Sequence, residues 1–257
     1  MVQRIITAVI AALLFLPFVI LGGWAFRIIT VILAVVGLFE LFRMKSIPIF
    51  STSGFLSVLV IWVIMLPEVP FGLTKMEIIL VYALLLLAYT VLVKNRFTFD
   101  EVGFLLLSIV YVGMGFYYLL ETRSAGLEFI IYAFAVIWAT DSGAYFFGRA
   151  FGKTKLWPLI SPKKTVEGFI GGIGLAVITA LIFQYIYPIH SSVWIVIIVT
   201  IFTSICGQIG DLVESALKRH YNVKDSGKLL PGHGGILDRF DSLIYILPIL
   251  HFVQFIS

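Results

Sequence analysis

The sequence has little charge, almost no cysteine and no nucleotide-binding loop of the Walker type. Only 12% of its 257 residues are charged, which is about half the share found in soluble domains. Cys206 is the one cysteine, so no disulfide can form within the chain, and we expect a packed, inert thiol. The Cys and His spacing of a zinc site is missing, and so is the pattern G-x-x-x-x-G-K-[ST]. These absences argue against a disulfide-stapled domain, a zinc protein and a Walker-type ATPase.

Long apolar runs are what the chain does contain. Hydrophobic residues make up 61% of it, and the mean hydropathy is +1.09. Since about 20 helical residues cross a bilayer, we expect an all-α, polytopic integral membrane protein, with residues 1–257 forming a single membrane domain. The predicted transmembrane helices are nine: 5–22, 24–42, 54–70, 75–93, 102–120, 126–147, 167–188, 192–217 and 236–256.

The first apolar stretch resembles a signal peptide, because a basic residue, Arg4, precedes an apolar run. It is long for one, however, and no Ala-x-Ala cleavage pattern follows, so we interpret it as a retained first span. The third span is short and is interrupted by Pro67 and Pro70, and the eighth becomes polar towards its end. These two spans are therefore the least regular of the nine.

The distribution of Lys and Arg predicts the orientation. With nine spans, the N-terminus and the even-numbered loops carry fifteen of these residues and the other side carries three. The positive-inside rule then places the N-terminus in the cytoplasm and the C-terminus outside a cell (inner) membrane. Ten of the fifteen lie in or directly after two loops, 148–166 and 218–235. This excess predicts a cytoplasmic anion site, although attraction to lipid headgroups explains part of it.

The segment 207–241 carries the first set of candidate functional residues. If the eighth helix continues into it, Asp211, Glu214, Ser215 and Lys218 share one helix face. Asp211 follows its apolar run so closely that it lies within the membrane boundary, where an unpaired carboxylate costs about 3 kcal/mol. Pairing, hydration or a bound metal would offset that cost, so a structural Asp–Lys pair between helices is the alternative to a metal site.

Two further acids, Asp238 and Asp241, open the ninth helix with Arg239 between them. Acids in a first helical turn also stabilise the helix dipole, and that simpler role stays open. Clustered carboxylates of this kind suit Mg²⁺, which shares its coordination shell with water and substrate phosphates.

The glycine-rich run "PGHGG" at 231–235 precedes these acids. Glycine allows main-chain N–H groups to approach an anion at the start of a helix. His233 could bind phosphate or move a proton, and a histidine that is simply satisfied within the loop is the other interpretation.

The second set of candidates lies in the segment 139–172. Asp141 is a carboxylate within the apolar sixth span, and Arg149, Lys153 and Lys155 follow it. Before the seventh span come Ser161, Lys163, Lys164 and Thr165. Because paired lysines at a helix N-terminus oppose the dipole, we expect an anion to offset them, either a phosphate chain or an acidic lipid headgroup.

In the predicted topology both segments face the cytoplasm. Together they supply carboxylates, cations, hydroxyls and glycines to one membrane face. This inventory is typical of phosphoryl or nucleotidyl transfer, in which the protein positions phosphates and spreads their charge over metal and basic side chains.

On these residues the sequence resembles the phosphatidate cytidylyltransferase family, the CDP-diacylglycerol synthases. The family pattern S-x-x-K-R, K-D-x-G/S and P-x-H-G-G-x-x-D-R-x-D corresponds here to Ser215, Lys218, Arg219, Lys224, Asp225, Pro231, His233, Gly234, Gly235, Asp238, Arg239 and Asp241. A second pattern corresponds to Asp141, Ala144, Tyr145, Ser161, Pro162, Lys164, Thr165, Glu167 and Gly168. These motifs lie in residues 122–257, whereas 1–121 match only in hydropathy.

The resemblance implies transfer of the cytidylyl group from CTP to phosphatidic acid, with Mg²⁺ as cofactor and CDP-diacylglycerol and pyrophosphate as products. A second, monovalent cation is compatible with the acids, and a homodimer is left open. As metal ligands it implies Asp211, Asp238, Asp241 and Asp141. As catalytic residues it implies Asp211, Lys218, Asp238, Arg239 and Asp241. As substrate-binding residues it implies Ser161, Lys163, Lys164, Thr165, Ser215, Arg219, Lys224, Lys228, His233, Gly234 and Gly235.

Two other functions remain to be separated from this one. A CTP-dependent polyprenol or phytol kinase would release CDP in place of pyrophosphate. An ion-coupled transporter would use Asp141 and Asp211 near the midplane of the bilayer. The choice between CTP and dCTP and the acyl-chain preference lie beyond the sequence.

Overall fold

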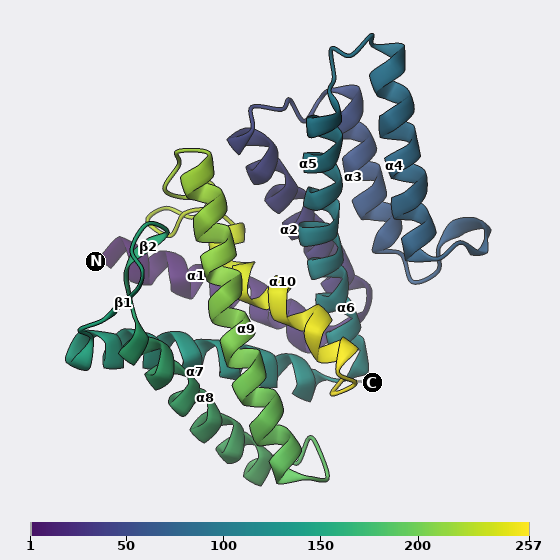
Figure 1. Cartoon of the computed structure of the whole chain (residues 1–257). Helices are drawn as coiled ribbons and strands as arrows, with labels where there is room; N and C mark the ends of the chain where they lie inside the picture. Colours follow the sequence, from purple (N-terminus) through teal and green to yellow (C-terminus); the bar gives the residue numbers. More distant parts are fainter. Residues whose placement is uncertain (1, 257) are drawn as a thin grey trace. The chain divides into compact units, whose positions relative to one another are not determined.

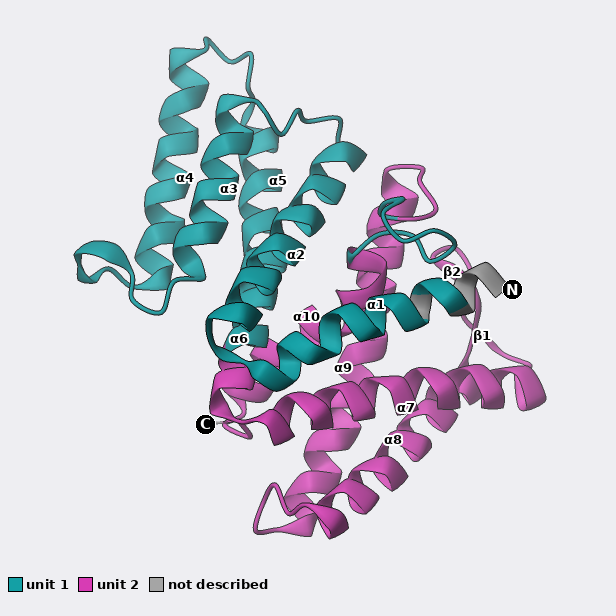
Figure 2. Ribbon diagram, turned by 180° about the vertical axis from the view of Figure 1, so that it is seen from behind, with its two compact units in different colours: residues 1–120, 226–236 teal, residues 121–225, 237–257 magenta. Residues whose placement is uncertain are grey.

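The computed structural model describes residues 2–256, without the side chains of 2–5 and 8. The described chain is helical apart from one small hairpin, and it divides into two compact units (Figures 1 and 2). Unit 1 comprises residues 1–120 and 226–236, and unit 2 comprises 121–225 and 237–257. The loop 226–236 therefore belongs with the N-terminal helices, although it follows α9 (Val193–His220) in the sequence.

Unit 1 is a set of packed helices with an additional short turn. Its elements are α1 (Val2–Leu21), α2 (Gly23–Met44), α3 (Thr52–Ile64), η1 (Pro70–Gly72), α4 (Lys75–Leu92), α5 (Phe99–Ser108), η2 (Ile109–Met114) and the first part of α6 (Gly115–Ala125). The helices α3, α4 and α5 lie side by side (Figure 2). α2 packs on α1, on α3 and on the π-helical segment η2.

The helix starts in unit 1 follow from local capping. Thr74 and Glu77 form a reciprocal capping box at α4, and Thr98 and Glu101 form the same arrangement at α5. The Ser51 side chain accepts from the Gly54 N–H at α3. Such caps satisfy main-chain donors that the first helical turn leaves without a partner, so the start of each helix is encoded locally.

Unit 2 carries both motif segments. Its further elements are α7 (Leu127–Phe151), β1 (Lys155–Trp157), β2 (Ser161–Thr165), α8 (Val166–Ile186), α9 (Val193–His220) and α10 (Leu237–Phe252). α7 and α8 approach closely because glycines line their interface: a Cβ on Gly172 would lie 2.8 Å from the Thr140 carbonyl oxygen. α9 packs against α7, α8 and α10.

The hairpin of β1 and β2 is a departure from the predicted all-α fold. The two strands pair antiparallel, with Lys155 opposite Thr165 and Trp157 opposite Ser161, and β2 packs against α7 and α8. The segment 148–166, expected to be a loop, thus holds Ser161, Lys163 and Lys164 on a short strand that runs directly into α8.

Each predicted span coincides with a helix or helical segment of the described chain. Six of them are long and apolar enough to cross a membrane: Gly23–Met44, Lys75–Leu92, Phe99–Ala125, Leu127–Phe151, Val166–Ile186 and Val193–His220. Thr52–Ile64 and the stretch Val9–Leu21 of the first helix are apolar but shorter, and α10 has 16 residues. The structure therefore describes a multi-pass membrane protein with six candidate spans, and the count of nine stays a prediction.

The helix surfaces also fit a lipid environment. Large apolar side chains stand exposed on successive helices, including Leu14 in α1, Leu84 in α4 and Ile170 in α8. Extended apolar surface of this kind is rare on soluble monomers and is normal where acyl chains cover it.

Candidate active site

The end of α9 presents the functional face that its spacing predicts. The helix continues through His220, so Asp211, Glu214, Ser215 and Lys218 lie on one side of it. Gly210 allows α10 to come close there, because a Cβ at this position would lie 2.7 Å from Tyr245 Cβ and 3.1 Å from the Asp241 carbonyl oxygen. This close crossing brings the first acids of α10 next to α9 within unit 2.

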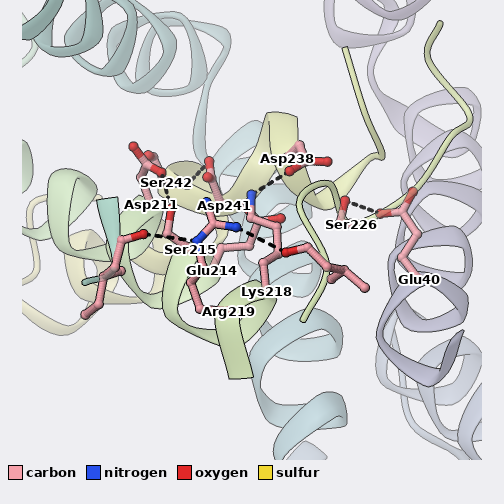
Figure 3. Close-up of polar contacts among 12 residues, drawn as sticks. Glu40, Asp211, Glu214, Ser215, Lys218, Arg219, Ser226, Asp238, Asp241 and Ser242 are labelled. Atoms are coloured by element: carbon pink, nitrogen blue, oxygen red, sulfur yellow. Dashed lines mark hydrogen bonds and ion pairs between the residues drawn. The ribbon is translucent and has the colours of Figure 1, made fainter. Parts of the chain in front are cut away.

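Lys218 joins two carboxylates from these helices (Figure 3). Its Nζ lies 2.5 Å from Glu214 Oε2 and 2.6 Å from Asp238 Oδ1. The side chains are almost fully removed from solvent, with exposed fractions of 11% for Lys218, 0% for Glu214 and 7% for Asp238. Glu214 Oε1 is buried and has no hydrogen-bond partner among the described residues. A buried cation between two acids holds the start of α10 against the end of α9.

A second ion pair joins the two motif segments. Lys164 Nζ on β2 lies 2.5 Å from Asp211 Oδ2 on α9, and it donates to the Gln208 carbonyl oxygen at 3.4 Å. Lys164 thus has a carboxylate of the same chain to offset its charge, and the expected phosphate chain or acidic lipid headgroup stays a prediction. Asp211 therefore forms an Asp–Lys pair, as in the alternative to a metal ligand, but its partner lies on a strand and not on another helix.

Three acids of unit 2 nevertheless repel one another. Asp141 on α7, Asp211 on α9 and Asp241 on α10 lie close enough for their charges to interact, and Lys164, Arg239 and Lys218 are the nearby opposite charges. Asp241 Oδ1 accepts from the Ser242 N–H at 2.7 Å. Negative charge is in excess here, because Lys218 also pairs with Glu214 and Asp238, so that five carboxylates share these three cations.

The donor chemistry of these acids fits Mg²⁺, but Asp211 is already part of an ion pair. Carboxylate oxygens are the ligands that Mg²⁺ uses in proteins. In the part of the chain that the structure describes, however, no three Asp, Glu, His or Cys side chains are grouped to hold a metal ion. Asp211 and Asp238, two of the four predicted ligands, each bind a lysine. A metal would have to share or replace those lysines.

The other predicted cations, Arg219 included, have exposed side chains. Arg219 Nε donates to the Ile160 carbonyl oxygen at 3.4 Å, and its guanidinium donates to that of Val223 at 3.3 Å (Figure 3). This arginine therefore ties the end of α9 to the turn of the hairpin. Lys163, Lys224, Lys228 and Arg239 are exposed.

The predicted hydroxyl residues Thr165, Ser215 and Ser161 lie close to these cations in the sequence, and the first two contact other groups of the protein. Thr165 is buried and caps α8, since its side chain accepts from the Gly168 N–H at 3.1 Å. The Ser215 hydroxyl faces Asp211 Oδ1 at 3.4 Å, a long contact. Ser161 is half-buried at the start of β2. The predicted wall of Ser161, Lys163, Lys164 and Thr165 is thus the strand β2, whose last residue, Thr165, also caps α8.

The glycine-rich turn lies in unit 1, and its main-chain N–H groups donate hydrogen bonds within the turn itself. The N–H groups of His233 and Gly234 both donate to the Leu230 carbonyl oxygen, at 2.9 and 3.1 Å. Gly232 and Gly234 have φ of 78° and 88°, a region that favours glycine. Two of the donors expected to face an anion are therefore committed to the turn, and a phosphate bound here would need other donors.

Two acidic residues that the sequence reasoning left out of the site are prominent in the structure. Glu214 was placed on the functional face but given no role, and it is the fully buried partner of Lys218. Glu40, in α2, accepts from the Ser226 hydroxyl (Figure 3). It also accepts from the Ile236 N–H at the end of the same loop, 226–236. The signal for Glu40 was present, because a carboxylate within an apolar span is as costly there as at Asp141.

A cavity of about 640 Å³ lies elsewhere, within unit 1. Lys45, Lys94 and Arg96 line it together with Tyr89 and Glu101, and none of the predicted site residues does. The polar cluster of unit 2 is the better candidate for chemistry, because it combines several acids with the buried Lys218 and the half-buried Lys164.

Comparison with known proteins agrees with the motif residues over the whole chain. The model of the cytidylyltransferase family matches residues 2–257. A phosphatidate cytidylyltransferase of Bacillus subtilis (strain 168) is 54% identical over 261 residues, covering 98% of this chain and 97% of the relative. Enzymes of the same name from Staphylococcus epidermidis (strain ATCC 12228 / FDA PCI 1200) and Staphylococcus aureus (strain COL) are each 48% identical over 251 residues, covering 96% of both chains.

Proposed function

The chain belongs to the cytidylyltransferase family, and we propose that it transfers the cytidylyl group of CTP to phosphatidic acid, giving CDP-diacylglycerol and pyrophosphate. Relatives that carry this activity in their name cover nearly its full length. The observation that carries the proposal in the structure is the meeting of both motif segments at the Lys164–Asp211 pair.

In this reaction an oxygen of the phosphatidic acid phosphate attacks the α-phosphorus of CTP. A new P–O bond forms, the bond from the α-phosphorus to the bridging oxygen breaks, and pyrophosphate leaves with the electron pair. A phosphate monoester, with a second pKa of about 6, is mostly ionised near neutral pH, so the attacking oxygen needs no strong general base. The enzyme must bring two polyanions together and stabilise the leaving group.

The cations of unit 2 suit that task. Lys164, held between Asp211 and Gln208, would bind a phosphate of one substrate. Arg219 and the exposed Lys163, Lys224 and Arg239 would neutralise the remaining phosphate charge. Lys218 is buried between two acids, so its first effect is to fix α9 against α10.

Mg²⁺ would be held by Asp211 and Asp241, with Asp141 next to them. The support is their mutual electrostatic interaction, which a divalent cation would relieve. When bound, the ion would neutralise phosphate oxygens and the leaving pyrophosphate. Asp238, whose Oδ1 binds Lys218, is the weaker candidate of the four predicted ligands.

The site would face the cytoplasm of a nine-span protein in the cell (inner) membrane. The excess of Lys and Arg in 148–166 and 218–235 supports that orientation. CTP would then arrive from solution, and phosphatidic acid would enter sideways from the leaflet with its acyl chains remaining among lipids. The six long apolar helices support the membrane location itself.

The test is a turnover assay with labelled CTP and phosphatidic acid under a Mg²⁺ titration. We expect CDP-diacylglycerol and pyrophosphate as products, and at least a hundredfold loss in Asp211→Asn and Asp241→Asn, about 3 kcal/mol of barrier. Asp100→Asn, an exposed acid of unit 1, is the matched control and should keep full activity. Release of CDP with a phosphorylated lipid would instead identify a lipid kinase, and full activity of both Asn variants would refute the metal assignment.

A further inference from the structure

Glu40 is a buried carboxylate in the part of the chain that carries no recognised motif. It lies in α2 within the run "GLFELFRM", a candidate membrane span, and only 3% of the residue is exposed. A carboxylate in such a place is costly unless hydrogen bonds or opposite charges compensate for it. Glu40 therefore needs a reason to be there, and its contacts supply one.

The two oxygens of Glu40 bind the two ends of one loop segment. Oε2 accepts from the Ser226 hydroxyl at 3.0 Å, and Oε1 accepts from the Ile236 N–H at 2.8 Å. Ser226 and Ile236 are the first and last residues of the segment that belongs to unit 1. These contacts join residues 186 and 196 positions apart, so a single side chain from the second helix closes the motif loop.

The glycines at the ends of the loop are fitted to this carboxylate. A Cβ built on Gly227 or on Gly235 would overlap with the Glu40 side chain, and at Gly235 also with the Ser226 hydroxyl. Neither glycine has a positive φ, so the close approach of Glu40, and not backbone conformation, requires the missing side chain. Gly235 belongs to the motif, so at this position the motif requires glycine because Glu40 packs against it.

We propose that Glu40 is a positioning residue for cytidylyl transfer: it fixes both ends of the loop 226–236. The loop carries Lys228 and His233, and the chain continues from Ile236 into α10, where Asp238 and Asp241 follow two and five residues later. By holding the Ile236 N–H, Glu40 sets the point from which the chain enters α10. This inference rests on the proposed function, since it assigns Glu40 a role towards that site.

Hydrogen exchange tests the contact itself. In the full-length protein, we expect the amides of 226–236, and that of Ile236 above all, to exchange at least about tenfold faster in Glu40→Gln and Glu40→Ala. Glutamine keeps the shape but turns an NH₂ group towards one of the two donors, so the smaller change already breaks one contact. Glu68→Gln, an exposed acid of unit 1, is the control and should leave the loop unchanged.

Kinetics test the link to catalysis. Because small displacements of reacting groups cost up to about a hundredfold, we expect kcat to fall at least about tenfold in Glu40→Ala, with the KM for phosphatidic acid within about twofold of wild type. Glu40→Asp keeps two acceptor oxygens and should recover part of that loss. A merely structural residue would lower the melting temperature without this split between kcat and KM and without recovery by aspartate.

Ser226→Ala removes the hydroxyl group that donates to Glu40, so it tests the same contact from the loop side. The test therefore stays valid if the Glu40 variants fail to fold. We expect faster loop exchange, a fall in kcat of about threefold, and a non-additive effect when it is combined with Glu40→Gln. Faster exchange with kcat within about twofold of wild type would overturn the proposal, and so would lost activity with an unchanged loop. Since loop exchange is independent of the reaction, an active Asp241→Asn would refute the proposed metal site while leaving the Glu40 contact intact.

Discussion

Units 1 and 2 both bury carboxylates, but they satisfy them in different ways. In unit 2, Lys218 lies between Glu214 and Asp238, and Lys164 binds Asp211, so the carboxylates are paired with side-chain cations. In unit 1, the contacts of Glu40 described above are a hydroxyl group and a main-chain N–H.

The difference separates side chains that can bind a substrate phosphate from groups that can only hold the backbone in place. A lysine that binds a carboxylate can exchange it for a substrate phosphate, because both partners are anions with similar geometry. A main-chain N–H bound to a carboxylate fixes the backbone and has little freedom to turn to a ligand. Unit 2 is therefore the place for phosphate chemistry, and unit 1 supplies a fixed loop.

Breaking the ion-pair network at its centre should have the largest effect. Lys218→Met removes the cation between Glu214 and Asp238 and leaves two buried acids without it. We expect the free energy of unfolding in detergent to fall by about 3 to 5 kcal/mol, the usual cost of losing one partner of a buried ion pair. Lys224→Met, an exposed lysine of unit 2, should leave stability unchanged.

The double variant Lys218→Met/Glu214→Gln sharpens this result. It removes one of the uncompensated charges, so it should recover part of the lost stability. Equal stability of Lys218→Met and wild type would mean that the pair contributes nothing to the packing of α9 on α10.

A moderate effect is expected at the close crossing of α9 and α10. Gly210→Ala places a Cβ 2.7 Å from Tyr245 Cβ, so the helices must shift, at a cost of about 1 to 3 kcal/mol. Gly174→Ala in α8 is the matched control, because no atom lies within 4 Å of the added Cβ. There the same substitution should stabilise the helix by about 0.5 to 1 kcal/mol.

Thermal unfolding of the two variants should therefore show shifts of opposite sign. Turnover should fall only in Gly210→Ala, since that crossing brings Asp241 next to Asp211. Shifts of the same sign in both variants would show that the crossing is loose enough to accept a methyl group.

How much of this arrangement could be read from the sequence depends on the range of the interaction. The helices were predictable, because apolar runs and capping residues such as Thr74 and Glu77 act locally. The shared face of Asp211 and Lys218 was predictable for the same reason, since helical spacing fixes it. The hairpin 155–165 was missed, because its strands are short and polar and carry no alternating apolar pattern.

Contacts between distant segments were beyond the sequence. Spacing could not show that Lys164 meets Asp211, that Asp238 binds Lys218 rather than standing free for metal, or that Gly235 faces Glu40. Each of these depends on which helices become neighbours. Glu40 illustrates the limit best: its burial in an apolar span is visible in the sequence, but its partner lies in a loop at the other end of the chain.

The smallest expected effects come from removing helix caps. The same substitution can be made in each unit, with the same expected loss of stability. Thr98 caps α5 in unit 1 and Thr165 caps α8 in unit 2, each by accepting a main-chain N–H. Thr→Ala should lower stability by about 1 kcal/mol at either position. Only Thr165→Ala should also reduce turnover, by a few fold, because Thr165 directly follows Lys164 on β2 and fixes the strand against α8. Thr165→Ser, which keeps the capping hydroxyl, should restore turnover. If Thr98→Ala reduced turnover as much as Thr165→Ala, both caps would act through general stability, and the separation of reacting and positioning parts would not hold.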